Sequence, residues 1–506
     1  MANGEWRMAN EKWREGFGVD NSPMNTRAQP ASSSGASAPH SLSFDALALT
    51  PAALSNLQQL GLTHMTPIQA ASLPLTLAGH DLIAQASTGS GKTVAFGLPL
   101  VNRLEAPRMN VQALILCPTR ELADQVAQEI RRLARAVENI KVVTLCGGVP
   151  LRGQILSLEH GAHVVVGTPG RILDLIDRNA LHLGAVQTLV LDEADRMLDM
   201  GFLDDIAKVV KQCGVNRQTL LFSATYPEGI DRLAAQFLKN PKTVQVAAQH
   251  DMSTLQQVFV EVKENERLLA VSQVLRHYRP TSALAFCNTK NQCRQLVAQL
   301  QAQGFSAMAL FGELEQRERD QVMVQFANRS CNVLVATDVA ARGLDVADLA
   351  AVINVDVSPD PEVHVHRIGR TARAGAQGLA VTLASLDEMG YVGRIELLQG
   401  RESDWLPLAE LSKSKDAEPP LKAPMATLQI VGGRKEKIRA GDVLGALTGE
   451  AGFQKEQVGK INVNEFSTYV AVSAAIAREA VQRLSEGRIK GRMVRVRLLG
   501  LNSSPD

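Results

Sequence analysis

A glycine-rich segment combines the residue types that bind phosphate. Residues 86–93 read ASTGSGKT, which fits the pattern GxxxxGK[ST] with Ala86 at the first glycine position. In such a loop the glycines let backbone N–H groups approach phosphates, and the N-terminus of the following helix favours an anion. Lys92 is expected to reach the β- and γ-phosphates, and Thr93 to hold Mg²⁺. The pattern predicts a nucleoside triphosphate site made by Ser87, Thr88, Gly89, Ser90, Gly91, Lys92 and Thr93.

An acidic segment later in the chain could complete this site. The apolar run from Thr188 to Leu191 leads directly into Asp192-Glu193-Ala194-Asp195. Acidic residues at the C-terminal end of a strand beside a phosphate loop bind the metal of the nucleotide and orient the attacking water. We expect Asp192 to bind Mg²⁺ through water and Glu193 to orient the water. A solvated acidic turn is the alternative, and the preceding phosphate loop disfavours it.

The elements that must position these segments begin at about Phe44, where short apolar runs start to alternate with amphipathic stretches. Short β-rich runs separated by helical patterns are typical of βαβ units and parallel sheets. Two series of about five strands therefore predict two α/β domains. The strands are expected at 113–117, 141–145, 163–166, 188–191 and 219–222, and then at 282–286, 305–310, 332–336, 351–355 and 379–383.

The chain divides further at its ends and between the two series. Residues 30–39 read PASSSGASAP, which is low-complexity and predicts a disordered tail. The joint between the series is expected within 239–258, where Pro241 interrupts the pattern. The predicted organisation is a tail over 1–40, α/β domains over 41–245 and 255–402, a linker over 403–424 and a small domain over 425–500.

The last block is small and basic. Its pattern predicts the order strand, helix, strand, strand, helix, strand, which is the layout of an RRM-like α+β domain. From Leu421 to Asp506 the chain has 14 lysine and arginine residues against 8 aspartate and glutamate residues. This surplus indicates an appendage that binds a polyanion, with an ordinary solvated face as the alternative.

The motifs and their order over 44–400 resemble the DEAD-box family of ATP-dependent RNA helicases. The resemblance implies two tandem RecA-like domains that bind ATP and Mg²⁺. Residues 61–69, GLTHMTPIQ, look like the Q motif, which assigns adenine recognition to Gln69 and packing near the base to Phe44. Residues 336–345, ATDVAARGLD, are similar to motif V and imply nucleotide contacts by Gly343 and Asp345.

The resemblance also implies an RNA-binding side and a coupling segment. Hydroxyls, backbone amides and guanidinium groups suit phosphate and ribose contacts, which carry no base information. The implied RNA-contacting residues of the core are Pro118, Thr119, Arg120, Gly147, Gly148, Thr168, Pro169, Gly170, Arg171, Asn288, Thr289 and Thr337. The implied coupling residues are Ser223, Thr225 and His366.

Two arginines lie far from the phosphate loop. Residues 366–373, HRIGRTAR, are similar to motif VI, with Ala372 in place of the usual glycine. Arg367 and Arg370 make sense if the second domain delivers them across a cleft as arginine fingers, which accelerate related phosphoryl transfers about 10³–10⁵-fold. Hydrolysis would then depend on domain closure, which RNA can gate. His364 and His366 could pair on one strand face as metal ligands, but His366 belongs to motif VI, so we assign no metal there.

Residues 425–500 resemble the RNA-binding domain of the DbpA family, bacterial DEAD-box proteins that are directed to 23S ribosomal RNA. The segments GGRKEKIRAGDVLGALTG (432–449) and IKGRMVRVRLL (489–499) carry this resemblance, which implies a 23S hairpin and pre-50S particles as partners. Tyr469 lies in the third predicted strand, but the first supplies no aromatic residue, so the usual stacking of bases on an RRM sheet is disfavoured. The residues expected to contact RNA instead are Arg434, Lys435, Lys437, Arg439, Lys490, Arg495 and Arg497.

Composition excludes several other classes. Hydrophobic residues make up 45% of the chain, yet no apolar run approaches the 18 residues of a transmembrane helix. The six cysteines include no CxxC pair, which indicates reduced thiols, and the charged N-terminus lacks the apolar core of a secretory signal. We therefore expect a cytoplasmic monomer without membrane contact.

Together these features predict an RNA-stimulated ATPase that separates or remodels short RNA duplexes, directed to 23S rRNA during assembly of the 50S ribosomal subunit. A DNA helicase on the same core is one alternative. An ATP-gated RNA clamp or scaffold is another, and a general RNA chaperone helicase without rRNA specificity is a third.

Overall fold

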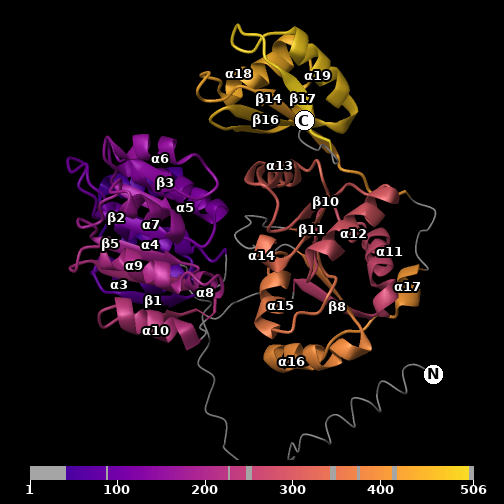
Figure 1. The fold of residues 1–506 in the computed structure, drawn as a ribbon, viewed down its shortest axis with the longest axis horizontal. Coiled ribbons are helices and arrows are strands. Elements are labelled where there is room, and N and C mark those ends of the chain that lie inside the picture. The colour runs from indigo at the N-terminus through magenta and orange to yellow at the C-terminus, as the bar shows by residue number, and fades with distance from the viewer. Residues whose placement is uncertain are drawn as a thin grey trace, which may run out of the picture. The chain divides into compact units, whose positions relative to one another are not determined.

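The computed structural model describes residues 42–86, 89–225, 228–246, 254–341, 349–372, 377–412 and 419–500. Three sheets organise these residues (Figure 1). The first two sheets are parallel in every strand pair and the third is antiparallel, which confirms the predicted fold class. The predicted tail over 1–40 lies outside the described residues.

The first sheet has the strand order β3-β4-β2-β5-β6-β1-β7. Its strands are β1 (Leu82–Gln85), β2 (Ala113–Leu116), β3 (Val142–Leu145), β4 (Val164–Gly167), β5 (Thr188–Asp192), β6 (Gln218–Ser223) and β7 (Lys242–Gln245). Successive residues of β1 belong to different cores, because Leu82 and Ala84 pack in one cluster and Ile83 in the other. Helices therefore cover both faces, as the period of two in a strand requires.

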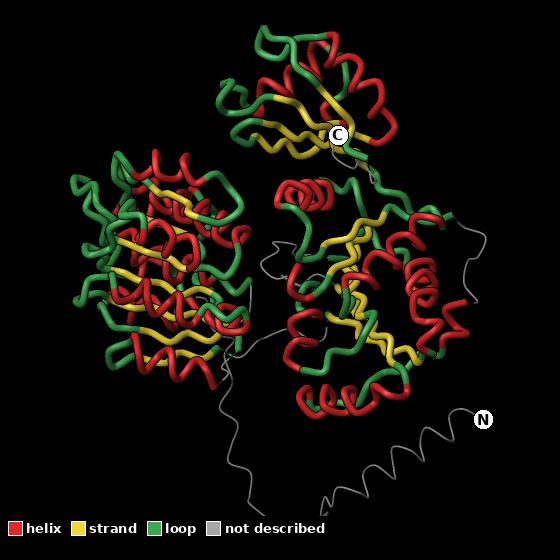
Figure 2. The backbone as a smooth tube through the Cα atoms, viewed as in Figure 1, coloured by secondary structure: helices red, strands yellow, loops and turns green. Residues whose placement is uncertain are grey.

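Helices alternate with these strands along the chain (Figure 2). They are α2 (Pro51–Gln59), α3 (Pro67–Leu77), α4 (Lys92–Asn102), α5 (Arg120–Leu133), α6 (Leu151–Leu158), α7 (Pro169–Asp177), α8 (Ala194–Asp199), α9 (Leu203–Lys211) and α10 (Glu228–Phe237). Helix α5 shows why the sequence folds this way. Its buried residues Ala123, Val126, Ala127 and Ile130 recur at helical spacing and face one core.

The second sheet has the strand order β10-β11-β9-β12-β13-β8. Its strands are β8 (Leu255–Glu261), β9 (Ala283–Phe286), β10 (Ala307–Leu310), β11 (Val333–Ala336), β12 (Ala351–Asn354) and β13 (Gly378–Ala384). The helices are α11 (Arg267–Tyr278), α12 (Lys290–Ala302), α13 (Gln316–Ala327), α14 (Asp338–Ala341), α15 (Pro361–Ile368), α16 (Met389–Gln399) and α17 (Leu408–Ser412).

Three strands differ from the sequence-based expectation. The segment 239–258, expected to be a joint, contains β7 and the start of β8, and β1 was not predicted at all. Strand β7 lies at the sheet edge and buries only Val244, so it has no apolar run to reveal it. Strand β8 carries two consecutive glutamines, Gln256 and Gln257, which interrupt its apolar pattern.

The third sheet has the strand order β15-β16-β14-β17. Its elements are β14 (Met425–Val431), α18 (Ala440–Gly445), β15 (Val458–Val463), β16 (Ser467–Ser473), α19 (Ala477–Glu486) and β17 (Val496–Leu498). This is the predicted order of elements. Strand β17 is short, because only Val496–Leu498 pair with β14 and the preceding chain forms a tight turn closed by Ile489 and Arg492.

None of the helices in the described parts of the chain is long and apolar enough to cross a membrane.

Candidate functional site

The glycine-rich segment forms a turn between β1 and α4. Gly91 has φ +94°, and a Cβ atom added there would lie 2.4 Å from Gln69 Nε2, so backbone and space both require glycine. Lys92 begins α4 and is buried, and its Nζ donates a hydrogen bond to the carbonyl oxygen of Ala86 at 3.0 Å. This hydrogen bond holds the Lys92 side chain against the residue that follows β1. Ser87 and Thr88 lie outside the described residues.

Gln69 lies directly beside this loop. Its Oε1 accepts from the backbone N–H of Thr66 at 3.0 Å, and its Nε2 donates to the carbonyl oxygen of Gly91 at 3.1 Å. The first contact caps helix α3 and holds the amide in place. Phe44, predicted to pack near the base, is 2% exposed and lies in the core of the first domain.

The acidic segment follows the end of β5. Asp192 is buried, and its Oδ1 accepts from the backbone N–H of Glu193 at 3.1 Å. Burial raises the pKa of Asp192 to about 7, with Lys92 opposing the rise and Glu193 adding to it. Glu193 has φ +52°, a left-handed conformation that is uncommon outside glycine and is concentrated at functional sites. Its Oε2 lies 3.3 Å from Arg196 Nη1.

Asp195 joins the acidic segment to the residues after β6. Its Oδ2 accepts from the backbone N–H groups of Ala224 at 3.2 Å and Thr225 at 3.0 Å, and from the Thr225 hydroxyl at 3.0 Å. Burial alone would raise the pKa of Asp195, but the Thr225 donors and Lys92 outweigh it and lower the pKa. The Ser223 hydroxyl donates to the Thr225 carbonyl oxygen at 2.6 Å. Asp195 was missed as a site residue, although its place in the acidic segment could have indicated it.

A cavity of about 120 Å³ lies against this unit. It is lined by Asp195, Arg196 and Thr225 together with His366, Arg367 and Arg370. Burial and the nearby Arg196 lower the pKa of His366 to about 4, although Asp195 acts in the opposite direction. His366 is therefore neutral at pH 7. The cavity brings the predicted coupling residues Thr225 and His366 to one place.

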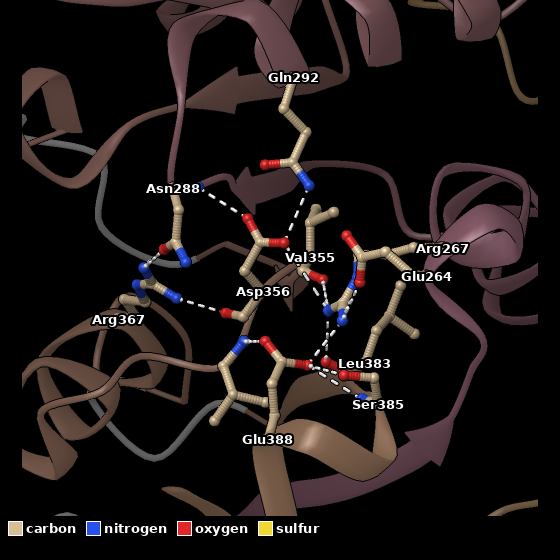
Figure 3. Close-up of polar contacts among 11 residues, drawn as sticks. Glu264, Arg267, Asn288, Gln292, Val355, Asp356, Arg367, Leu383, Ser385 and Glu388 are labelled. Atoms are coloured by element: carbon tan, nitrogen blue, oxygen red, sulfur yellow. Dashed lines mark hydrogen bonds and ion pairs between the residues drawn. The ribbon is translucent and has the colours of Figure 1, made fainter.

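Arg367 is held by acceptors of its own domain (Figure 3). It is 2% exposed, and its Nε and Nη2 donate to Asp338 at 2.7 and 2.6 Å. Nη1 donates to the Asp356 carbonyl oxygen at 2.8 Å, and Nη2 also donates to Asn288 Oδ1 at 3.2 Å. Four of its five N–H groups are therefore committed to acceptors of the second α/β domain, and the finger role expected for Arg367 stays a prediction.

Asp356 connects this arginine to the loop after β9. Its carboxylate accepts from the backbone N–H of Asn288 at 2.7 Å and from Gln292 Nε2 at 2.8 Å (Figure 3). It also lies 3.7 Å from the buried Arg267, which donates to the Val355 carbonyl oxygen at 2.7 Å. Arg267 is further paired with Glu388 at 2.6 Å and Glu264 at 2.9 Å. Asp338 lies within the motif V segment 336–345 but was not singled out there, and no motif contained Asp356 or Arg267, because their contacts join segments distant in sequence.

The predicted RNA-contacting residues of the core follow the C-terminal ends of parallel strands, which share one edge of each sheet. Two of them cap helices through their hydroxyls: Thr119 accepts from the N–H of Leu122 at 3.3 Å and Thr289 from the N–H of Gln292 at 3.2 Å. Thr168 occupies the N-cap position of α7 without a side-chain hydrogen bond to the helix. The remaining core residues of this set lie in the loops or in the first helical turns that follow these strands. Pro118, Gly147, Gly148, Asn288 and Thr337 are in loops, whereas Arg120 begins α5 and Pro169, Gly170 and Arg171 form the first turn of α7.

Arg171 connects helix α7 to a neighbouring loop. Its Nη1 donates to the carbonyl oxygen of Val149 at 3.2 Å, which links the start of α7 to the loop after β3. Gly148 in that loop has φ +76°. Gly343 and Asp345, predicted to contact the nucleotide, lie outside the described residues.

His364 and His366 do not share a strand face, as their spacing had suggested. Both lie in helix α15, where residues two apart point to different sides. His364 is fully buried, with its Nε2 3.1 Å from Gln257 Nε2. No cluster of three potential metal ligands occurs among the described residues.

The basic residues of the third domain divide between loops and sheet. Arg434, Lys435, Lys437 and Arg439 are exposed in the loop before α18, and Lys490 Nζ donates to the Lys437 carbonyl oxygen at 2.6 Å. Arg497 lies on β17 and donates to Gln429 Oε1 at 2.7 Å, whereas Arg495 precedes the strand and is exposed.

Comparison with known proteins decides the family. Three family models match the chain: DEAD/DEAH box helicase over 66–233, helicase conserved C-terminal domain over 265–375 and DbpA RNA binding domain over 427–498. The chain is 48% identical over 451 residues to the ATP-dependent RNA helicase DbpA of Escherichia coli (strain K12), which covers 89% of this chain and 98% of that protein. The chain belongs to the DEAD-box family of ATP-dependent RNA helicases.

Other DEAD-box helicases match the core. The helicase CshA of Streptococcus pneumoniae serotype 4 is 44% identical over 374 residues, which cover 74% of this chain and 71% of that protein. Among solved structures, S. cerevisiae Dbp5 bound to RNA and ADP BeF3 is 29% identical with a TM-score of 0.66, covering 73% of this chain and 97% of that one. Mss116p bound to single-stranded RNA and AMP-PNP is 27% identical with a TM-score of 0.65, covering 76% and 84%.

These findings confirm the predicted enzyme class. The chain is an ATP-dependent RNA helicase of the DbpA type, with a DbpA RNA-binding domain after the helicase core.

Proposed function

We propose that this helicase uses ATP and Mg²⁺ to separate or remodel short duplexes of 23S rRNA during assembly of the 50S subunit, as a cytoplasmic monomer. The observation that carries the rRNA target is the match of residues 427–498 to a DbpA RNA binding domain. The exposed basic loop of that domain supports RNA as its ligand. The core residues that follow the strand ends suit backbone contacts, so sequence preference is assigned to the last domain.

The nucleotide roles follow from the contacts of each residue. Gln69 recognises the adenine, and Lys92 exchanges the Ala86 carbonyl oxygen for the β- and γ-phosphates. Glu193 holds the attacking water, since its backbone conformation and Arg196 fix the carboxylate beside the end of β5. Thr93 and Asp192 offer hydroxyl and carboxylate oxygens, the ligand types that Mg²⁺ prefers, and the ion would neutralise charge on the phosphates.

The arginines of the second domain take different roles. Arg370 lines the cavity beside Asp195 and is assigned to the phosphates. Arg367 is assigned a positioning role, because Asp338, Asp356 and Asn288 occupy its guanidinium. Coupling runs through Asp195 and Thr225, since their hydrogen bonds join the acidic segment to the end of β6.

ATPase rates with three RNAs at equal nucleotide concentration test the rRNA target. The RNAs are a 23S fragment with the peptidyl-transferase hairpin, an unrelated structured RNA and poly(A). The proposal expects the 23S fragment to stimulate most, and expects a Lys435→Gln/Lys437→Gln variant to reduce that advantage. Equal stimulation by all three RNAs would assign a general RNA chaperone activity instead.

A second experiment tests the enzymatic assignment. Glu193→Gln should lower hydrolysis by about 10²–10⁴-fold while ATP analogues still bind. Asp204→Asn, an exposed acidic residue on α9, is the matched control and should leave the rate unchanged. If Glu193→Gln still supported subunit assembly in cells, an ATP-gated clamp would replace the helicase proposal.

A further inference from the structure

The turn between β15 and β16 presents an aromatic ring to solvent. Phe466 is 59% exposed, and every other phenylalanine that the structure describes is buried or half-buried. Leaving such a ring in water forfeits part of its burial free energy. Single exposed apolar residues are common on protein surfaces, so it is the neighbours of this ring that make it a candidate contact for a ligand.

The aromatic residue on the sheet itself is not available in the same way. Tyr469 on β16 is 5% exposed, and its hydroxyl accepts from Gln429 Nε2 at 3.3 Å. Gln429 in turn accepts from Arg497 Nε at 2.7 Å, so a chain of hydrogen bonds crosses β17, β14 and β16. Little of the Tyr469 ring is therefore accessible for stacking with a base.

The backbone beneath Phe466 is held by the loop before α18. The N–H groups of Gly432, Arg434 and Lys435 donate to the carbonyl oxygens of Phe466, Asn464 and Glu465 at 3.1, 2.9 and 3.1 Å. A Cβ atom at Gly433 would lie 2.2 Å from the Asn464 carbonyl oxygen, so glycine is needed for this close approach. Backbone hydrogen bonds between the two loops therefore hold Phe466 in place. Because the loop is already ordered, less conformational entropy is lost when a ligand binds.

One cation lies over the ring, and further basic residues follow it in the same loop. Lys435 Nζ lies 4.4 Å from the centroid of Phe466 and 3.1 Å from the Glu465 carboxylate, and Arg434 Nε donates to the Val463 carbonyl oxygen at 3.1 Å. The loop 432–439 carries Arg434, Lys435, Lys437 and Arg439 against Glu436 alone. Aromatic rings close to basic side chains are a combination by which proteins bind unpaired nucleotides. The excess positive charge of this loop disfavours an apolar protein surface as the ligand of Phe466.

We propose that Phe466 forms a stacking site for one unpaired base of the bound RNA, with Lys435 over the ring and Arg434 at the neighbouring phosphate. The site rests on the proposed RNA recognition by the third domain and deepens it. Because a π-face accepts any base, Phe466 supplies affinity for unpaired RNA, and the surrounding cations supply the salt-dependent part.

Fluorescence anisotropy with the full-length protein tests the site. The probes are a labelled 23S hairpin fragment, an unrelated hairpin with a loop of equal length and a blunt RNA duplex. Phe466→Ala should weaken binding of both hairpins about 5- to 150-fold, the range for one stacked base, and should leave duplex binding unchanged. Phe466→Trp should restore the hairpin affinity and Phe466→Leu should not. Met493→Ala, at another exposed apolar residue of the domain, is the matched control.

Salt titration separates the ring from its cations. Arg434→Gln, which removes the cation assigned to the phosphate, should reduce the slope of log affinity against log salt by about one, whereas Phe466→Ala should keep the slope of the native protein. Unchanged hairpin binding by Phe466→Ala, or full restoration by Phe466→Leu, would overturn the stacking site. A loss of a protein contact with unchanged RNA binding would overturn it in favour of a protein partner. If the unsubstituted protein bound the two hairpins with equal affinity, the 23S target would be contradicted. The Phe466 variants would still test the stacking site, because the expected loss applies to both hairpins.

Discussion

His364 should make the stability of the second α/β domain depend on pH. The imidazole is fully buried in α15 and stacks on Phe259, with ring centroids 6.0 Å apart. Gln257 Oε1 accepts from Arg401 at 2.6 Å, which turns the Gln257 amide NH₂ toward His364 Nε2 at 3.1 Å. Nε2 must therefore accept a hydrogen bond, and a protonated ring would place two donors against each other.

The sign and size follow from the pKa of this group. Burial, with repulsion from Arg367 and Arg401, lowers the pKa of His364 from 6.5 to about 3. Below pH 6.5 the unfolded chain takes up a proton that the folded domain does not accept until about pH 3. The stabilisation is therefore complete above pH 6.5 and is lost progressively as the pH falls toward 3. Between pH 7.5 and pH 5 the loss in free energy of unfolding is about 2 kcal/mol.

Trp405 offers a local reporter, because its ring centroid lies 5.5 Å from that of Phe259. The chain has three tryptophans, so Trp6→Phe and Trp13→Phe leave Trp405 as the single one. Urea unfolding followed by its fluorescence gives the free energy of unfolding of this domain at each pH. The parent should lose about 2 kcal/mol more than His364→Gln between pH 7.5 and pH 5. Equal losses in the two proteins would refute the reasoning, whatever their difference at pH 7.5.

Three further predictions concern the helicase core. Asp195→Asn should slow strand displacement at least about tenfold relative to Asp204→Asn, because a neutral amide replaces a carboxylate that accepts three hydrogen bonds from residues 224–225; equal rates would contradict the coupling role. Asp356→Asn should lower RNA-stimulated kcat and cost about 1–3 kcal/mol of domain stability, since the Asn288 N–H loses its charged acceptor. Glu264→Gln, which alters a 77% exposed partner of the same network, should change neither quantity appreciably. Arg367→Lys should lower the unfolding midpoint of the second domain, whereas Arg370→Lys should lower kcat by about 10³-fold with an unchanged midpoint; the reverse pattern would return the finger role to Arg367.

The sequence by itself determined the family, the order of the domains and most strands. The phosphate loop and the acidic segment could be recognised because each is a run of consecutive residues whose chemistry needs that spacing. Ten strands were predicted near their observed positions, since buried parallel strands appear as short apolar runs. Strand β7 had no such run, because an edge strand that buries one valine leaves no apolar pattern.

Only the tertiary structure decided how individual side chains are used. Arg367 belongs to a recognisable motif, yet its acceptors Asp338, Asp356 and Asn288 come from three other segments and hold it within its own domain. The exposure of Phe466 likewise depends on the loop 432–435, which meets the β15–β16 turn backbone to backbone. Such contacts join residues distant in sequence, so they cannot be predicted from local spacing or composition. The tertiary packing determines which of these residues come into contact.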